Sequence, residues 1–363
     1  MTHVKRIRSK KGQDMNRRIT AAISMTAIGA IALLAGCAPS SAGGDGKHQI
    51  TVGIAMASAL QPRWKFDVAA MQEAAKGDGV KTIVQYANLD PAVQANQVQA
   101  MVNKGIDVLI INPVSAAEAG TIVSRAASQG VKVISYDQNV DADVDYNVTR
   151  SLEQAGQLQI DAALKAVPHG NYALIKGDNA AGPIAATMAD QYAKAIDGSD
   201  GNVSVVYQTW TANWDPGKAQ DEAEAALTAK DNKIDAFVVS NDGMATGVIQ
   251  ALKGAHLAGK VFVSGMDADE KNLAYIASGE QSMTVYTDVE AMGKIAMTGA
   301  VALASGKSPQ LDEPHQKNGE FAAPTKFVPI LAVTKSNLCE FLTKDAPKGW
   351  ANPAVVFGGA SQC

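Results

Sequence analysis

From His48 onward, short apolar runs rich in β-branched residues alternate with amphipathic stretches that repeat at helical spacing. The runs predict strands and the amphipathic stretches predict helices. In the first half we expect strands at 50–55, 81–86, 107–112 and 131–136, and helices at 63–76, 91–103 and 116–128. Asp90 and Pro91 mark one helix start, because the first N–H groups of a helix lack partners within it. Strands this uniformly apolar are typical of parallel sheets that helices cover on both faces.

The same alternation starts again after a turn-rich segment at 141–145. We expect a helix at 152–166 and strands at 172–176, 203–207, 234–240 and 261–264, with helices between them. A chain of 363 residues is long for a single hydrophobic core, which favours two domains. We therefore predict an α/β protein with two doubly wound parallel sheets. No apolar run after residue 48 is long enough to predict a membrane span.

The N-terminus combines seven basic residues with an apolar segment at 21–34 and small residues directly before Cys37. The sequence Leu34-Ala35-Gly36-Cys37 resembles the site at which bacterial lipoprotein-processing enzymes cut. The resemblance implies a lipoprotein signal peptide at 1–36, a diacylated Cys37, and a lipidated tether at 37–48 that is rich in Ser and Gly. The alternative is a membrane-anchoring helix in which Cys37 has no special role. Met15 is a second candidate start.

The charge of the chain argues against one class of partner. The whole chain has a formal net charge of −4, and the leader at 1–36 carries seven basic residues and one acidic residue. Removing the leader leaves 25 basic and 35 acidic residues. Binding a phosphate backbone requires clustered Lys and Arg, so this acidic chain is not expected to bind nucleic acid.

Two cysteines, Cys339 and Cys363, lie near the C-terminus. Export would place them in a compartment where disulfides persist. A bridge between them would hold the segment that contains Trp350 against the domain, and two unrelated thiols are the alternative. No spacing of Cys and His suits zinc, so we predict no metal site.

In open parallel sheets, ligands bind at the carboxyl ends of the strands. Polar and aromatic residues gather at these positions, although only 5% of the chain is aromatic. In the first half they are Gln61, Arg63, Trp64, Asn112, Asp137 and Gln138. In the second half they are Asp178, Asn179, Trp210, Asn213, Trp214, Asn241, Asp242 and Asp267. Carboxylates, amides, a guanidinium and indole rings are the groups that recognise neutral polyhydroxylated ligands.

Each of these positions also has a purely structural interpretation. An Asp or Asn at a strand end commonly caps the next helix. Trp64 could anchor its helix in the core, and Trp210 could pack beneath its loop while Trp214 faces the ligand. The convergence of both halves on the same residue types favours the binding interpretation.

The motifs that an enzyme of this fold class would need are missing. The turn after the first strand lacks the glycine pattern of a dinucleotide site, and there is no P-loop. There is no Gly-x-Ser-x-Gly elbow, and no histidine at a strand end that could act as a base. Asp267 and Asp269 could in principle serve a glycosidase, but they lie two residues apart in one loop. We predict a binding protein without a cofactor.

Several segments together resemble the periplasmic sugar-binding proteins of ABC transporters, of the ribose/galactose type. The resemblance extends from about residue 49 to about residue 335 and is strongest to the D-xylose-binding branch. It depends on the segments 62–64, 97–113, 133–137, 232–236, 240–242, 264–269 and 283–286, and on Trp214.

The resemblance implies a periplasmic binding protein type I fold, with a three-segment hinge near 146–150, 283–287 and 323–327. The N-terminal lobe would comprise 49–147 plus 287–324, the C-terminal lobe 148–284 plus 327–340, and a tail 341–363. The implied ligand contacts are Arg63, Trp64, Asp137, Gln138, Trp214, Asn241 and Asp267.

The implied function is that of an extracytoplasmic lipoprotein, expected to be a monomer, which is anchored to the cell membrane by Cys37. It would capture a monosaccharide between its lobes and deliver it to an ABC transporter permease. The alternative use of the same fold is a sugar- or polyol-sensing receptor that feeds a chemoreceptor or a sensor kinase. A transcriptional regulator of this fold does not fit, because the N-terminus is typical of an export signal.

The sequence also departs from the D-xylose-binding pattern at charged positions. Gln138 stands where that branch has an arginine, and Thr287 stands where it has a lysine. Pro62 replaces an acidic residue, and Pro183 and Met188 align with an asparagine and an arginine. Since a buried hydroxyl left unpaired costs about 1–3 kcal/mol, the same sugar could not be held by the same bonds. Xylose, another pentose, a hexose, a polyol and a less polar ligand therefore all stay open.

Overall fold

The computed structural model describes residues 48–61, 63–181, 183–199, 201–318, 321–359 and 363. His48–Cys363 form one unit. The predicted signal peptide, Cys37 and all of the predicted tether except His48 lie outside the described residues. Among the helices that the structure describes, none is both long enough and apolar enough to cross a membrane.

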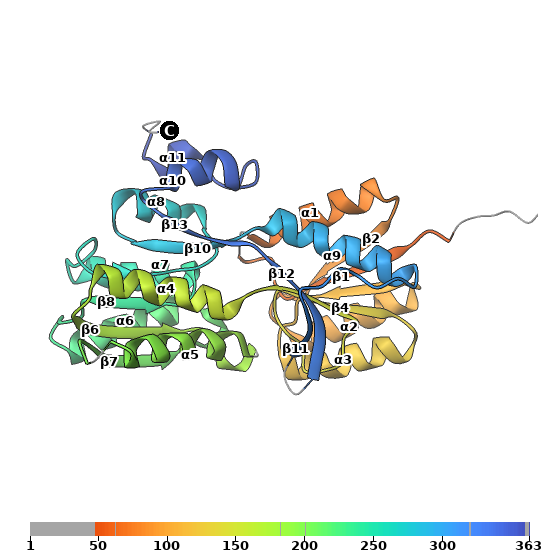
Figure 1. Ribbon diagram of the computed structural model, residues 1–363, viewed down its shortest axis with the longest axis horizontal. Helices are drawn as coiled ribbons and strands as arrows, with labels where there is room; N and C mark the ends of the chain where they lie inside the picture. Colours follow the sequence, from red (N-terminus) through yellow and green to blue (C-terminus); the bar gives the residue numbers. More distant parts are fainter. Residues whose placement is uncertain (1–47, 62, 182, 200, 319–320, 360–362) are drawn as a thin grey trace, which may run out of the picture. The chain divides into compact units, whose positions relative to one another are not determined.

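The first sheet has seven strands in the order β11-β12-β5-β4-β3-β1-β2 (Figure 1). All neighbouring pairs are parallel except β11 with β12. The strands are β1 (Thr51–Met56), β2 (Lys81–Tyr86), β3 (Val108–Ile111), β4 (Lys132–Tyr136), β5 (Tyr146–Arg150), β11 (Glu313–Asn318) and β12 (Phe321–Val328).

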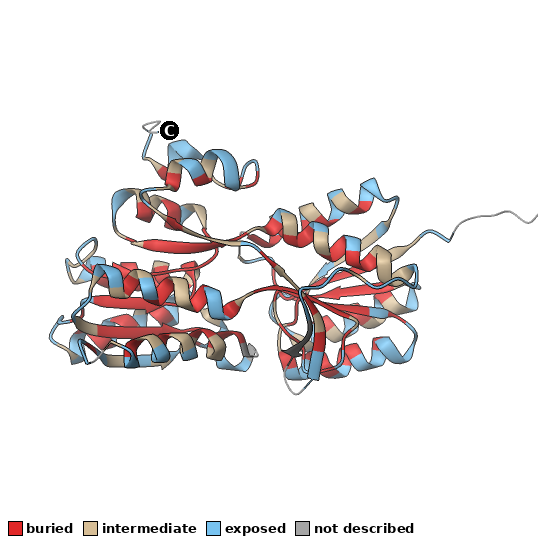
Figure 2. Ribbon diagram, in the orientation of Figure 1, coloured by how far each residue is buried: buried red, intermediate tan, exposed pale blue. Residues whose placement is uncertain are grey.

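Two pairs of helices cover the two faces of this sheet. Helices α1 (Arg63–Gly77) and α9 (Val289–Ala304) pack on one face, and α2 (Pro91–Asn103) and α3 (Ala116–Ser128) pack on the other. Ile54 of β1 points to the first face and Ala55 to the second, because successive side chains of a strand alternate. Both faces are apolar, so the strand interiors are buried (Figure 2). We call this sheet and its helices the N-terminal lobe.

The second sheet is parallel, with the strand order β7-β6-β8-β9. Its strands are β6 (Gly170–Lys176), β7 (Val203–Trp210), β8 (Ala236–Val239) and β9 (Phe262–Val263). Phe237 faces α6 (Pro216–Ala229) and α7 (Asp242–Gly254), whereas Val238 faces α4 (Leu152–Ala166) and α5 (Pro183–Asp197). With α8 (Glu270–Ser278), these elements form the C-terminal lobe, which has its own hydrophobic core.

The strand order reverses between β1 and β3 in the first sheet, and between β6 and β8 in the second. At such a point the loops that follow the two neighbouring strands run to opposite faces of the sheet and leave a crevice. The two reversals therefore mark where each lobe can offer side chains to a ligand.

The three predicted crossing segments coincide with strands. The segments 146–150 and 283–287 are β5 and β10 (Met283–Thr287), and 323–327 lies within β12. Strand β12 pairs with β5 in parallel, with Thr325 opposite Asn147. Strand β10 pairs antiparallel with β13 (Ile330–Thr334).

The C-terminal segment contains α10 (Leu338–Glu340), a π-helical turn at Phe341–Asp345, and α11 (Pro353–Val356). A disulfide joins Cys339 to Cys363. Trp350 is buried, and its Nε1 donates a hydrogen bond to the carbonyl oxygen of Ala268 at 2.7 Å. Its ring lies 4.7 Å from that of Phe66 on α1, measured between centroids. The tail therefore contacts elements of both lobes.

The helices predicted at 91–103, 116–128 and 152–166 are confirmed with the same bounds, and Asp90 accepts hydrogen bonds from the N–H groups of Ala92 and Val93. The prediction that all strands are buried on both faces is wrong for β2 and β7. Both are edge strands, which the helices cover only in part. Strand β11 was not predicted, because its sequence Glu-Pro-His-Gln-Lys-Asn has no apolar residue that signals a strand.

Candidate ligand-binding site

Arg63, the first residue of α1, is buried and forms ion pairs with three carboxylates. Its Nη2 lies 3.3 Å from Oδ1 of Asp67 and 3.0 Å from Oδ1 of Asp137, and its Nη1 lies 3.3 Å from Oδ1 of Asp267. Burial opposes the charge of Arg63, but the three carboxylates raise its pKa well above the ordinary value. Arg63 is thus a permanent cation that contacts both lobes.

Asp137 directly follows β4, with a left-handed φ of 65°. Its carboxylate also pairs with Arg150, the last residue of β5. Burial alone would raise the pKa of Asp137, but Arg150 and Arg63 outweigh it and lower the pKa below the ordinary value. Two guanidinium groups therefore hold an ionised carboxylate in a fixed position.

Asp67 lies one helical turn after Arg63, on the side of α1 that faces the core. It accepts a hydrogen bond of 2.5 Å from the hydroxyl group of Tyr136. Burial raises the pKa of Asp67, although Arg63 and Tyr136 favour its ionised form. Asp67 therefore holds the guanidinium group of Arg63 in position from the core side of α1.

Asp267 follows the short strand β9 and has a φ of 110°. Its N–H donates to the carbonyl oxygen of Val285 in β10 at 2.8 Å, so the crossing strand fixes its backbone. Burial raises the pKa of its carboxyl group, and Arg63 and Arg150 act in the opposite direction.

The two candidate tryptophans have different surroundings. Trp64 is buried in the core of the N-terminal lobe, and the guanidinium carbon of Arg63 lies 4.5 Å from its ring centroid. Trp214 is half-buried, and its Nε1 is buried without a hydrogen-bond partner among the described residues. A Cβ atom on Gly177 would lie 2.0 Å from the Trp214 ring, so only glycine fits there. Gly177 thus makes room for the indole.

Asn241 is the N-cap of α7 and Asp242 its first residue, and both are buried. Asn241 Oδ1 accepts from the N–H of Met244 at 3.0 Å, which confirms the capping interpretation for this residue. Asp242 accepts from Gln281 Nε2 at 2.8 Å and from Thr284 Oγ1 at 2.9 Å. Burial, followed by Asp269 and Asp267, raises the pKa of Asp242 well above the ordinary value. Asp242 also accepts a hydrogen bond from the N–H of Asp269, so this buried side chain holds the backbone of the loop at 267–269.

Two adjoining cavities lie at these strand ends. The smaller, of about 30 Å³, is lined by Gln61, Arg63, Trp64, Asp137, Gln138, Arg150, Ile184, Trp214, Asn241, Met266 and Asp267. It thus includes all seven residues that the sequence predicts as ligand contacts. The larger, of about 360 Å³, shares Gln61, Trp64, Gln138 and Trp214 with it. That volume is within the range of small-molecule sites, about 300–1,000 Å³.

The larger cavity also brings together other strand-end residues, namely Asn112, Asp178 and Asn213. Asn179, Trp210 and Asp242 line neither cavity. The idea that Trp210 packs beneath its loop is wrong, since it is 38% exposed and stacks with Lys176, whose Nζ lies 4.0 Å from the ring centroid. No group of His, Cys, Asp and Glu suited to a metal ion occurs among the described residues.

A model of the periplasmic binding protein domain matches residues 52–308. The chain belongs to this family. It has the type I fold of periplasmic binding proteins, with two parallel-sheet lobes. A member of this family is a binding protein and not an enzyme.

Two relatives and one solved structure show which members this periplasmic binding protein is similar to. The D-xylose-binding periplasmic protein of Escherichia coli K12 is 36% identical over 301 residues, which cover 82% of this chain and 90% of that protein. The protein of the same name from Haemophilus influenzae is 34% identical over 328 residues, 88% of this chain and 95% of that protein. A carbohydrate transporter solute-binding protein from Chloroflexus aurantiacus, solved with D-glucose, has a TM-score of 0.76 at 27% identity, and the match covers 85% of this chain and 98% of that one.

Sequence reasoning missed Arg150 as a site residue of this periplasmic binding protein. Arg150 is buried, lines the smaller cavity and pairs with Asp137. A signal was present, because an arginine is the last residue of a predicted crossing and directly precedes Ser151, which caps α4. A buried strand end that carries a guanidinium group needs a carboxylate partner.

The departures from the D-xylose-binding pattern have different structural consequences. Met188 is buried in the core of the C-terminal lobe and lines neither cavity. Thr287 is buried as well and lines neither cavity. Gln138 lines both. Pro62 and the side chain of Pro183 lie outside the described residues.

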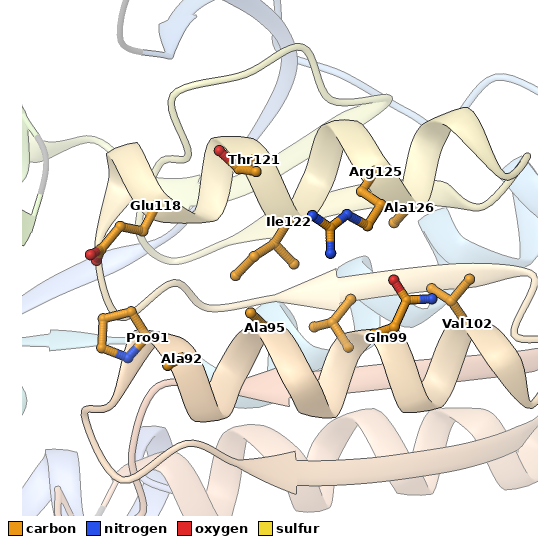
Figure 3. Close-up of a pocket in the computed structure, with 11 residues that line it drawn as sticks. Pro91, Ala92, Ala95, Gln99, Val102, Glu118, Thr121, Ile122, Arg125 and Ala126 are labelled. Atoms are coloured by element: carbon orange, nitrogen blue, oxygen red, sulfur yellow. The ribbon is translucent and has the colours of Figure 1, made fainter.

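A separate groove lies between α2 and α3 (Figure 3). Its wall consists largely of small and aliphatic side chains, with Gln99, Glu118, Thr121 and Arg125 as its polar members. None of the predicted ligand contacts lines it. The groove is therefore distinct from the strand-end cavities.

Proposed function

We propose that this protein captures a monosaccharide outside the cytoplasmic membrane and delivers it to the permease of an ABC transporter. The main support is that one small cavity collects all seven predicted contacts from both lobes. The names of its relatives point to the ligand class, since two bind D-xylose and one was solved with D-glucose.

The chemistry of the cavity suits a neutral ligand with several hydroxyl groups. Arg63 supplies fixed donors, and Asp137 and Asp267 supply acceptors that are already oriented by ion pairs. Trp64 and Trp214 supply flat apolar surfaces on which the C–H face of a sugar ring can lie. Xylose, another pentose or a hexose would all match this set.

The proposed mechanism is closure of two lobes about a three-segment hinge. The lobes comprise 49–147 plus 287–324 and 148–284 plus 327–340, followed by a tail at 341–363. Since each lobe supplies part of the hydrogen-bonding set, only a ligand that touches both can shift the protein toward the closed state. Strands β5, β10 and β12 are the segments at which we place the hinge.

The proposal includes the cellular context. After cleavage of the signal peptide at 1–36, a lipidated Cys37 would anchor a monomeric protein to the outer side of the cell membrane through the tether at 37–48. A Cys37→Ala variant should then fail to incorporate radiolabelled palmitate, while the parent chain is labelled. A membrane pull-down that recovers a sensor kinase or chemoreceptor and no permease would contradict the transport role.

Ligand binding is tested first by thermal shift against D-xylose, L-arabinose, D-ribose, D-glucose, D-galactose, myo-inositol and xylitol. At about a thousandfold excess over Kd, a ligand adds roughly 4 kcal/mol to the free energy of unfolding. We expect a saturable shift without consumption of the ligand. Asp267→Asn should weaken binding about 10- to 100-fold, because it removes a charged acceptor. Asp90→Asn, a change at the cap of α2, serves as the matched control.

A panel in which no compound stabilises the protein would overturn the proposal, and so would turnover of the bound sugar. A Kd for Asp267→Asn within twofold of the parent value would remove Asp267 from the site.

A further inference from the structure

Asp269 occupies the N-cap position of α8, but its side chain does not cap the helix. The carboxylates of Asp90, Asp215 and Asp288, at the N-caps of α2, α6 and α9, each accept a hydrogen bond from a backbone N–H in the first turn. Capping is the usual reason for an aspartate at this position. The carboxylate of Asp269 is therefore free of the role that its position in the sequence would give it.

The main chain of Asp269 is held firmly. Its N–H donates to Oδ2 of Asp242 at 3.0 Å, and its carbonyl oxygen accepts from the N–H groups of Asn272 and Leu273. These bonds do not involve the side chain, so the backbone stays in place whatever the carboxyl group does.

The carboxylate of Asp269 has an unused acceptor. Its Oδ1 is buried and has no hydrogen-bond partner in the part of the chain that the structure describes. No ion pair involves Asp269 among these residues either, although Arg63 acts on it electrostatically. A buried polar atom without a partner is rare and costs about 1–3 kcal/mol, so it calls for a partner from outside the chain.

The same residue lines the larger cavity, of about 360 Å³. Trp214 lines it too, and Nε1 of Trp214 is a buried donor that also lacks a partner among the described residues. Two residues that line this cavity thus each carry a buried polar atom without a partner among the described residues, an acceptor on Asp269 and a donor on Trp214. A hydroxyl group can donate to the first and accept from the second, and neighbouring hydroxyl groups of a sugar can do both.

We propose that Asp269 is a ligand contact that sets specificity, by accepting a hydrogen bond from one hydroxyl group of the bound sugar. This inference rests on the proposed function and deepens it, because it adds an acidic contact to the predicted set. It assigns the larger cavity to the ligand together with the smaller one.

The electrostatics of the loop are consistent with this role. Burial, followed by the neighbouring carboxylate of Asp267, raises the pKa of Asp269 to about 7, and Arg63 opposes them. Near neutral pH the protonated and the ionised forms of this carboxyl group are both populated. A hydroxyl group that donates to the carboxylate stabilises the ionised form.

The test is isothermal titration calorimetry with the compound from the seven-member panel that gives the largest thermal shift, and with its monodeoxy analogues. The parent protein should bind one monodeoxy analogue about 10- to 100-fold more weakly than the full sugar, because that analogue lacks the hydroxyl group that donates to Asp269. The Asp269→Ala variant should bind the full sugar more weakly than the parent protein by a similar factor. It should bind that analogue as tightly as it binds the full sugar. A side chain that only supported the loop would not change this discrimination.

Two further variants make the test decisive. Asp269→Asn keeps the size and one acceptor, so it should retain more affinity than Asp269→Ala. Asp288→Asn makes the same chemical change at a residue that lines neither cavity, and Asp288 already accepts from the N–H of Ala291 at 2.9 Å. Its Kd should stay within about twofold of the parent value, since an asparagine caps as well as an aspartate.

The inference is overturned if Asp269→Ala binds within twofold of the parent protein, or if it still discriminates against the same monodeoxy analogue. If no panel compound binds the parent protein, the proposed function itself fails. If the parent binds and only the Asp269 result is negative, the proposed function stands and this inference alone is lost.

Discussion

Nη1 of Arg63 and Oδ1 of Asp267 lie 3.3 Å apart, although 204 residues separate them in the sequence. Arg63 begins α1 of the N-terminal lobe, and Asp267 follows β9 of the C-terminal lobe. Both side chains are buried. The pair is thus a direct electrostatic link between the two lobes at the position proposed for the ligand.

Replacing Arg63 by alanine should destabilise the protein itself. The change leaves Asp67, Asp137 and Asp267 buried without their shared cation, and breaking a buried ion pair costs about 3–5 kcal/mol. Urea denaturation of Arg63→Ala and the parent protein measures this difference. Lys65→Ala, at an exposed basic residue of the same helix, should change the free energy of unfolding by less than about 0.5 kcal/mol. Equal stabilities of Arg63→Ala and the parent would contradict the structural role of Arg63.

Stability should depend on pH through Asp269. Its folded-state pKa of about 7 is raised above the ordinary value of 3.8, so its stabilising contribution is complete below that ordinary value and is lost as pH rises through about 7. Burial is the main cause of the raised pKa, Asp267 on the same loop adds to it, and Arg63 on α1 opposes it. Asp242 on α7 accepts a hydrogen bond from the backbone N–H of Asp269. Asp269→Asn cannot ionise.

The melting temperature of Asp269→Asn, relative to the parent protein, should therefore increase between pH 5.5 and pH 8.5. Thermal melts across this range, without sugar, provide the measurement. A difference that stays constant with pH would show that Asp269 is not the titrating group.

Gly177→Ala should weaken ligand binding through Trp214. A Cβ atom at this position would lie 2.0 Å from the indole ring, so the ring must move. Overpacking of this kind costs about 1–3 kcal/mol of stability, and the displaced indole would no longer line the two cavities in the same way. Calorimetry and thermal melts of Gly177→Ala test both effects.

Gly254→Ala is the matched control, because nothing lies within 4 Å of a Cβ atom there. It should leave Kd unchanged. If Gly177→Ala binds as tightly as Gly254→Ala, the close approach of Gly177 and Trp214 has no bearing on the ligand.

Reduction of the Cys339–Cys363 disulfide should lower the melting temperature. The bridge closes a loop with a sequence separation of 24, and the chain-entropy model gives about 3 kcal/mol for a loop of this order. Dithiothreitol should shift the parent protein and leave the double variant Cys339→Ser, Cys363→Ser unchanged. A parent protein that melts at the same temperature with and without reductant would show that the bridge adds no stability.

The periodicity of apolar residues was sufficient to predict most of the fold. The helices with capping signals, such as the one after Asp90, were predicted with their bounds, because capping is a local interaction. Strand β11 was missed, since its polar sequence forms a strand only by pairing with β12. The strand predicted at 203–207 extends to Trp210 in the structure. Its end was misjudged because edge strand β7 lacks the uniform apolar pattern of a buried strand.

The site was predictable in its residue types but not in its pairing. The rule that ligands bind at strand ends led to Arg63, Asp137 and Asp267, which line one cavity. It could not reveal that Arg63 is shared by three carboxylates, because that depends on contacts between distant segments. Asp269 was considered only as half of a catalytic pair with Asp267, since its sequence position resembles an ordinary N-cap.

The family match ends at residue 308, before β12 begins at Phe321. Strand β12 lies between β11 and β5 in the first sheet. A recombinant fragment cut at the end of the match would lack β11 and β12. Strand β5, which is buried along its whole length in the intact protein, would then become an open edge with unpaired backbone groups. Such a fragment should self-associate, so an expression boundary for this protein belongs beyond β12 and not at the limit of the family match.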